Sequence, residues 1–129
     1  MILGMEHIAI ASKDTLALKN WYQDMFGGEV VYDNGKGCYF LAFPDKTMIE
    51  FVVADRDKPE DVQTTAGIRH IAFAVDQENF DPTVAKLKAD PRVETVIDVK
   101  ENAKGIKTYW FRDCEGNFAH LIYRPNPLV

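Results

Sequence analysis

The feature that most constrains the fold of this chain is an internal repeat that places a histidine at the same point of two similar segments. Residues 6–11 read EHIAIA and residues 69–74 read RHIAFA, so His7 and His70 lie about half of the 129-residue chain apart. Self-similarity at such a spacing indicates a fold built from repeated units. Two imidazoles at equivalent positions are well arranged to share one metal ion, because neutral imidazole is the commonest protein ligand for transition metals.

Each half of the chain predicts the element order βαβββ. In the first half, a helix is expected at residues 15–26, where apolar residues recur at helical spacing and Gly27 and Gly28 follow as a terminator. Runs of alternating or β-branched residues bounded by turn sequences predict the strands of this half, at residues 2–11, 29–32, 38–43 and 48–53.

The second half repeats this order. Asp81 and Pro82 are expected to open a helix that continues through residues 83–89. Strands are predicted at residues 68–75, 93–99, 106–112 and 118–123. We therefore expect an α+β fold built from two βαβββ repeats. The prediction is a single domain with a first module at residues 1–54, an exposed linker at 55–67 and a second module at 68–129.

Strand parity divides these side chains between two faces, because successive residues of a strand point to opposite sides. One face of each module carries mainly isoleucine, phenylalanine and valine, and is expected to pack against the helix. The other face carries alanines beside polar residues. Aligning residues 48–52 with 118–122 makes Glu50 and His120 equivalent, as His7 and His70 are.

These four side chains, on the faces away from the helices, form a candidate metal site. One histidine on a strand would more often be a hydrogen-bonded core residue, but all 3 histidines of the chain fall at these positions. A carboxylate within an apolar strand is costly to bury unless it is paired or bound to metal. We predict that a divalent metal ion is bound by His7, Glu50, His70 and His120. Zn, Ni, Co and Fe(II) all suit such a donor set, and the sequence does not choose among them.

Three further residues are candidates for a substrate pocket. Thr108 and Trp110 share one parity and are expected to line it. Arg124 has the same parity as His120 and could meet an anionic substrate at the rim. The alternative for Arg124 is a solvated charge at the surface.

Composition and charge exclude several classes of partner. The net charge is −5 and the lysines and arginines are scattered, so no basic face for nucleic acid is expected. No segment has the apolar length of a membrane span, and the amino terminus does not resemble a signal peptide. Cys38 and Cys114 match no CxxC spacing and are expected to be free thiols. We expect a cytoplasmic protein that acts on a small molecule.

Four stretches resemble the vicinal oxygen chelate superfamily, which includes glyoxalase I, bleomycin and fosfomycin resistance proteins and extradiol dioxygenases. The stretches are HIAIA at residues 7–11, LKNWYQDMFGG at 18–28, RHIAFAV at 69–75 and FRDCEGNFAHL at 111–121. The resemblance implies that the two βαβββ repeats form curled mixed sheets around a shared metal cavity, with the helices on the outer face. It also implies a homodimer, as in most members. It places the metal on His7, Glu50, His70 and a fourth position. That position is usually glutamate in the family, and this chain has His120 there.

The resemblance also implies the chemistry. Two neighbouring substrate oxygens bind the metal, and Glu50 is the expected catalytic base. We therefore expect a glyoxalase I-like lyase or isomerase acting on a small α-hydroxycarbonyl substrate. Two alternatives stay open at this point: an Fe(II) extradiol-type dioxygenase, and a non-catalytic drug- or metabolite-binding protein of the resistance type.

Overall fold

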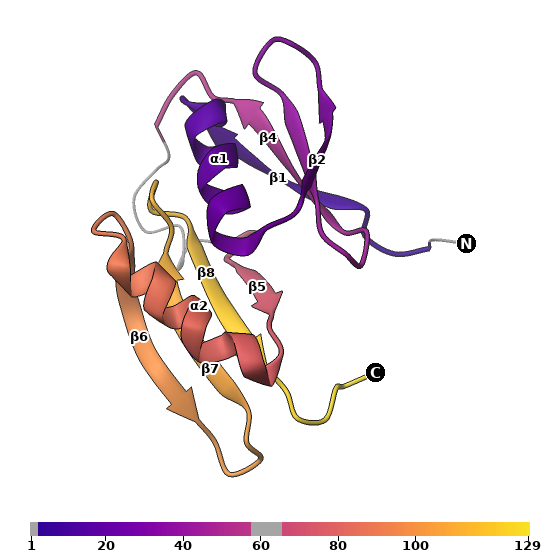
Figure 1. Cartoon of the computed structure of the whole chain (residues 1–129). Helices are drawn as coiled ribbons and strands as arrows, with labels where there is room; N and C mark the ends of the chain where they lie inside the picture. Colours follow the sequence, from indigo (N-terminus) through magenta and orange to yellow (C-terminus); the bar gives the residue numbers. More distant parts are fainter. Residues whose placement is uncertain (1–2, 58–65) are drawn as a thin grey trace. The chain divides into compact units, whose positions relative to one another are not determined.

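The computed structural model describes residues 3–57 and 66–129, which form two compact units of the same topology (Figure 1). We call residues 3–57 unit 1 and residues 66–129 unit 2. Most of the predicted linker, residues 58–65, lies outside the described part of the chain. Within the described residues, no helix is long and apolar enough to cross a membrane.

Unit 1 is a helix packed on a four-stranded mixed sheet. In chain order its elements are β1 (His7–Ser12), α1 (Thr15–Phe26), β2 (Glu29–Asp33), β3 (Tyr39–Ala42) and β4 (Met48–Val53). The strand order is β1-β4-β3-β2, in which β4 pairs with β1 in parallel and with β3 antiparallel.

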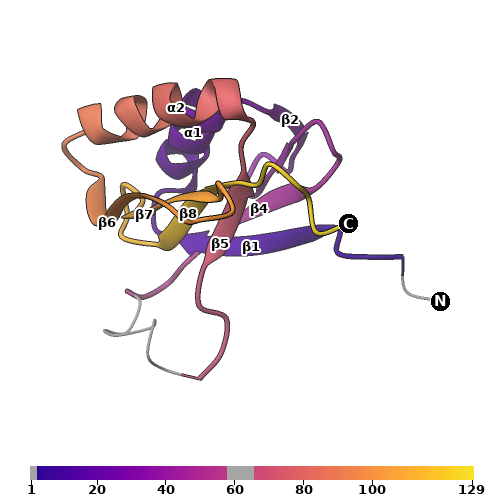
Figure 2. The same ribbon diagram turned by 90° about the horizontal axis from the view of Figure 1, so that it is seen from below.

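Unit 2 repeats this arrangement. Its elements are β5 (Ile71–Ala74), α2 (Gln77–Ala89), β6 (Glu94–Glu101), β7 (Lys107–Arg112) and β8 (Phe118–Tyr123). The strand order is β5-β8-β7-β6, again with a parallel pair, β5 with β8, followed by antiparallel pairs. Figure 2 shows α2 lying along one side of this sheet. The predicted pair of βαβββ repeats in an α+β fold is confirmed.

Helix α1 begins and ends as its sequence predicts. The side chain of Asp14 caps it by accepting a hydrogen bond from the amide of Ala17 at 3.1 Å. Gly27 ends it with φ of 75°, a left-handed conformation that costs a residue with a Cβ atom more than it costs glycine.

The expected start of the second helix, at Asp81 and Pro82, is wrong. Helix α2 begins at Gln77, and the side chain of Asp76 caps it by accepting from the amide of Asn79 at 2.9 Å. Pro82 therefore lies inside the helix, where it removes one backbone hydrogen bond. The earlier start brings Phe80 into the core with no exposed surface, and this burial together with the Asp76 cap offsets the proline.

The first and fifth strands are shorter than predicted. β1 starts at His7 because β4 starts at Met48, its partner across the parallel pair, so the preceding residues have no strand residue opposite them. β5 starts at Ile71, and His70 immediately precedes it. The candidate histidines therefore lie at the points where these two strands begin.

The core of each unit lies between its helix and its sheet, on the face that parity predicts. In unit 1, Leu18 and Tyr22 of α1 are fully buried against Leu41 and Phe51 of the sheet. In unit 2 the fully buried side chains include Phe80, Leu87, Tyr109, Phe111 and Leu121. The opposite face of each sheet, where the candidate ligands lie, takes no part in this packing.

The repeat extends to the turn before the third strand of each unit. The side-chain oxygen of Asn34 accepts from the amides of Lys36 and Cys38, at 2.8 and 3.0 Å. Asn102 accepts in the same way from Lys104 and Ile106, at 2.9 and 3.0 Å. These matched turns hold β3 and β7 in equivalent positions.

Candidate functional site

The pairing of strands places the candidate ligands of each unit next to one another on the face away from the helix. In unit 1, Glu50 of β4 lies between Ala9 of β1 and Phe40 of β3, and Ala9 is two residues after His7. The ring of His7 and the carboxylate of Glu50 consequently approach to 3.8 Å, from Nε2 to Oε1.

Unit 2 has the same geometry with different residues. His120 of β8 lies between Ala72 of β5 and Trp110 of β7, and Ala72 is two residues after His70. The rings of His70 and His120 are 5.1 Å apart, centroid to centroid. The predicted equivalence of Glu50 with His120 therefore follows from the strand pairing. Glu50 lies opposite Phe40 of β3, and His120 lies opposite Trp110 of β7.

Hydrogen bonds indicate how the ring of His7 is oriented. Its Nδ1 lies 3.0 Å from Oε1 of Glu6, and an ionised carboxylate can only accept, so Nδ1 is the donor. The Nε2 of a neutral ring then directs a lone pair toward Glu50. A cation would stabilise two electron-rich atoms that face each other in this way. Glu6 on Nδ1 corresponds to the carboxylate that accepts the other ring N–H of a metal-bound histidine in metalloproteins.

The second oxygen of Glu50 has a partner of its own. The thiol of Cys38 lies 3.6 Å from Oε2 and donates to it. Partial burial raises the pKa of this thiol, and the hydrogen bond and charge of Glu50 raise it further. The carboxylate is thus held from one side by Cys38, while its other oxygen faces His7.

In unit 2 both rings favour the neutral form that binds metals. Burial lowers the pKa of His70, and the charge of Arg69 lowers it further. Burial also lowers the pKa of His120; its hydrogen bond to the Leu121 carbonyl opposes this effect, and the charges of His70 and Arg124 add to it.

Free nitrogen atoms remain on these two rings. His120 Nδ1 lies 3.3 Å from the carbonyl oxygen of Leu121, which can only accept, so the proton is on Nδ1 and Nε2 carries the lone pair. His70 Nδ1 is buried and has no hydrogen-bond partner within the described residues. An unpaired buried polar atom costs about 1–3 kcal/mol, which a ligand would relieve. The chemistry of the donors in both units therefore fits a transition metal ion.

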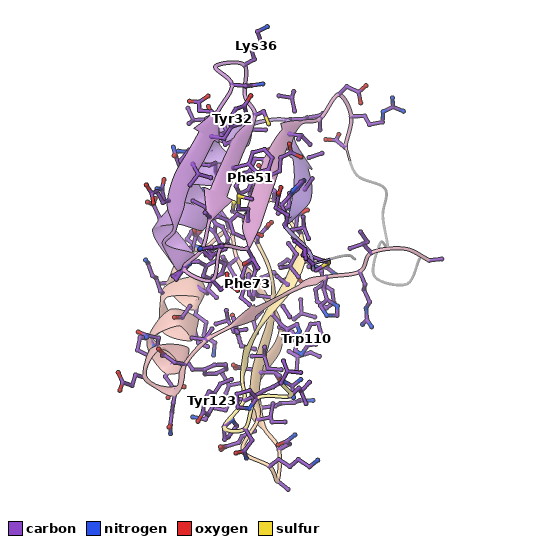
Figure 3. The ribbon with its side chains drawn as sticks, turned by 90° about the vertical axis from the view of Figure 1, so that its right-hand side faces the viewer. Tyr32, Lys36, Phe51, Phe73, Trp110 and Tyr123 are labelled. Carbon is purple, nitrogen blue, oxygen red and sulfur yellow. The ribbon has the colours of Figure 1, made fainter. Side chains whose placement is uncertain are left out.

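Aromatic rings pack against the histidines in both units. His120 stacks on Trp110 with centroids 3.9 Å apart and 21° between the planes, and His70 meets the same indole edge-on at 4.8 Å and 77°. Figure 3 shows Trp110 on the side of its sheet away from α2. In unit 1, His7 meets Phe40 edge-on at 5.1 Å and 76°.

The structure thus brings together His7 with Glu50 and His70 with His120, one pair in each unit. Within the described residues, no three His, Cys, Asp or Glu side chains form a group that could hold a metal ion. Thr108 lies opposite Ile122, on the face that carries Trp110 and His120. Arg124 follows the end of β8 and is half-buried.

Three contributors to these pairs are absent from the sequence prediction: Glu6, Cys38 and Phe40. Phe40 lies opposite Glu50 in the pairing of β3 with β4, and Cys38, two residues earlier, points to the same face. Extending the parity argument from β4 to its neighbouring strand could therefore have identified both residues. Glu6 precedes His7 and, by parity, would point to the opposite face. The position of His7 at the start of β1 allows its neighbour to reach the ring.

Comparison with known proteins identifies a family and an enzyme with a similar sequence. A sequence model of the Glyoxalase/Bleomycin resistance protein/Dioxygenase superfamily matches residues 4–121. Biphenyl-2,3-diol 1,2-dioxygenase 3 of Rhodococcus globerulus is 26% identical over 125 residues, which represent 91% of this chain and 61% of that enzyme. The chain spans about three fifths of the length of this relative.

Solved structures share the fold at low sequence identity. A glyoxalase/dioxygenase from Nostoc punctiforme superimposes with a TM-score of 0.78 at 17% identity, covering 96% of this chain and 92% of that chain. A mutant fosfomycin resistance protein from Listeria monocytogenes, complexed with Mn(II) and dihydroxypropylphosphonic acid, superimposes with a TM-score of 0.74 at 23% identity, covering 99% and 94%. The family match includes both repeats and all four candidate ligands, and we conclude that this chain belongs to the Glyoxalase/Bleomycin resistance protein/Dioxygenase superfamily.

Proposed function

We propose that this protein is a metal-dependent lyase or isomerase, in which His7, Glu50, His70 and His120 bind one divalent metal ion and a small α-hydroxycarbonyl compound is the substrate. The observation that carries this proposal is the repeated pairing of donors. Each unit presents two of them on the face of its sheet away from its helix, next to alanines that leave room for a ligand. The Mn(II) complex of the fosfomycin resistance protein supports a metal in this fold.

The metal and the site residues have separate roles in the proposed reaction. A bound divalent metal would polarise two neighbouring substrate oxygens and stabilise the negative charge that develops on them. Glu50 removes a proton next to the substrate carbonyl and returns it to the neighbouring carbon. Cys38 holds one oxygen of the Glu50 carboxylate by donating to it, while the other oxygen faces the Nε2 lone pair of His7, and Glu6 keeps the proton of His7 on Nδ1. Thr108, Trp110 and Arg124 remain the proposed pocket residues, with Arg124 opposite an anionic group.

The decisive experiment measures metal content by mass spectrometry on protein purified without an affinity tag. We expect about one transition metal ion per chain in the wild type, and a strong loss in Glu50→Ala and in His120→Ala. Glu29→Ala is the matched control, because Glu29 is an exposed strand glutamate of the same sheet. A wild type that stays free of metal after reconstitution would reject the enzyme and favour a binding protein of the resistance type.

The role of Glu50 as base is tested separately once a substrate has been found by screening. Glu50→Gln keeps the shape of the side chain and removes its basicity, so turnover should fall by roughly 10²–10⁴-fold. Retention of full turnover in Glu50→Gln protein that is loaded with metal would assign the proton transfer to another group.

A second experiment shows how the pairs are combined, since the homodimer expected from the family could form the site within one chain or between two. One variant lacks the unit 1 pair (His7→Ala with Glu50→Ala), and the other lacks the unit 2 pair (His70→Ala with His120→Ala). Mixed dimers of the two variants regain one metal ion per two chains only if each site uses unit 1 of one chain and unit 2 of the other. A site within a single chain gives no recovery.

The second candidate function is an Fe(II) extradiol-type dioxygenase, which the similarity to biphenyl-2,3-diol 1,2-dioxygenase 3 favours. Two histidines and one carboxylate with open positions support that chemistry in general, and this chain offers three histidines. Oxygen uptake by the iron-loaded protein with a catechol separates the two candidates. Turnover that requires oxygen supports the dioxygenase, and turnover of a hydroxycarbonyl compound without oxygen supports the lyase or isomerase.

A further inference from the structure

We propose that Trp110 is a positioning residue, whose indole holds the rings of His70 and His120 in the orientation that binds metal, and that Phe40 does the same for His7. This inference rests on the proposed function and deepens it. It adds a second task to the proposed pocket role of Trp110, because His120 already covers part of its indole ring.

The first argument is the geometry of unit 2. Trp110 lies directly opposite His120 across the β7–β8 pair, and the two rings stack at 3.9 Å. His70 contacts the same indole with its edge at 4.8 Å, so one side chain contacts both candidate ligands. Rotation of either imidazole would break its contact with the indole, and for His120 also the hydrogen bond to the Leu121 carbonyl.

The second argument is that unit 1 carries the same contact. Phe40 lies opposite Glu50 on the third strand, as Trp110 lies opposite His120. His7 meets Phe40 edge-on at 76°, and His70 meets Trp110 edge-on at 77°. The side chains differ, phenylalanine in one unit and tryptophan in the other, while the angle and the position of the contact are retained.

The third argument is that the helix-side cores do not use these rings. Phe40 and Trp110 are both half-buried. Phe40 lies opposite Glu50 on the face away from α1, and Figure 3 shows Trp110 on the side of its sheet away from α2. The neighbouring aromatics of β7, Tyr109 and Phe111, point to the other face and are fully buried. The contacts of Phe40 and Trp110 with the candidate ligands therefore explain their presence better than packing beneath the helices does.

The test compares metal affinity in variants at Trp110, measured by competition with a chelating dye for Co(II). Trp110→Leu should weaken binding by about three- to tenfold, because edge-to-face and stacked contacts of this kind are lost. Trp110→Phe keeps a ring opposite His120 and should stay within about threefold of the wild type. The matched control is Trp21→Phe, which alters the other tryptophan of the chain. Trp21 lies on α1, so this variant should bind Co(II) as the wild type does.

A second readout needs no metal and no activity. In the metal-free protein, the indole should shift the ring-proton NMR signals of His120 and His70 by its ring current. These shifts should disappear in Trp110→Leu and be reduced in Trp110→Phe. Phe40→Leu should affect only the signals of His7.

The outcomes separate this inference from the proposed function. Normal Co(II) binding by the wild type and equal binding by Trp110→Leu would overturn the role of Trp110 alone. Failure of the wild type to bind any metal would overturn the proposed function and this role with it. If Trp110→Leu does not fold, the wild-type spectrum decides, since unshifted His120 and His70 signals would overturn the inference.

Discussion

At the scale of single residues, neighbours set the chemistry of the candidate ligands. The carboxylate of Glu6 and the carbonyl of Leu121 place protons on the Nδ1 atoms of His7 and His120. The thiol of Cys38 binds one oxygen of Glu50. Outer partners of this kind orient ligands and tune them, so their loss is felt in metal affinity and in reactivity.

The contact between Cys38 and Glu50 predicts a change in thiol reactivity. In Glu50→Gln the negative charge that raises the pKa of Cys38 is gone, while the raising effect of burial remains. More thiolate is then present at a given pH, and the thiolate is the species that reacts. We expect Cys38 to be alkylated severalfold faster in Glu50→Gln at pH 8, measured by mass spectrometry with iodoacetamide.

Cys114 provides the internal reference for that measurement. Burial, followed by the charge of Asp113, raises the pKa of Cys114 to about 12, so this thiol should stay protonated and react slowly in both proteins. Equal acceleration at Cys114 would point to general loosening of the fold, and an unchanged rate at Cys38 would contradict the contact with Glu50.

The two histidines of unit 2 predict a loss of stability in acid. Burial lowers the pKa values of His70 and His120 below the ordinary value of 6.5, so the unfolded chain binds protons first as the pH falls. The free energy of unfolding should therefore hold its full value above pH 6.5 and decrease as the pH falls from there through the lowered pKa values.

Urea unfolding of metal-free protein in EDTA, between pH 5 and 8, measures this dependence. The slope of unfolding free energy against pH should become shallower in His120→Gln, which cannot titrate. The same slope in both proteins would show that other groups govern stability in this range.

At the scale of elements, the start of α2 is decided by its cap. Asp76→Ala removes the acceptor for the amide of Asn79 and should lower the free energy of unfolding by about 1 kcal/mol. Asp81→Ala is the matched control, because Asp81 lies within the helix and is exposed; its effect should stay within about 0.5 kcal/mol. Denaturant titrations measure both changes. If Asp81→Ala lowered the free energy of unfolding more than Asp76→Ala, the helix start predicted from the sequence, at Asp81, would be supported instead.

At the scale of the whole molecule, the proposal that donors from both units bind one metal ion predicts that this ion stabilises both units. Binding to the folded state alone contributes about 2.7 kcal/mol at a free metal concentration one hundred times the Kd. Hydrogen exchange followed by mass spectrometry should show slower exchange in β1–β4 and in β5–β8 on addition of Co(II), with no such change in Glu50→Ala. Slower exchange confined to one unit would contradict a single ion that uses both pairs.

Much of the site could be predicted because period-two alternation is local to each strand and the duplication repeats it in the second half of the chain. His7 and His70 lie in nearly identical segments, and parity alone separates them from the apolar face. The pairing register then makes Glu50 and His120 equivalent, as the alignment of their segments predicts. The four-residue ligand set itself remains a prediction, and the structure brings its members together two by two.

The sequence by itself determined the two βαβββ repeats, the apolar face of each sheet and the face that carries the candidate ligands, because these follow from local spacing. Only the tertiary structure decided where α2 begins, since burial of Phe80 and the Asp76 cap outweigh the local signal of Pro82. It also decided the side chains that contact the candidate ligands. Cys38 contacts Glu50 and Trp110 stacks on His120 because consecutive antiparallel strands pair in one particular register, and side-chain alternation along a single strand does not fix that register.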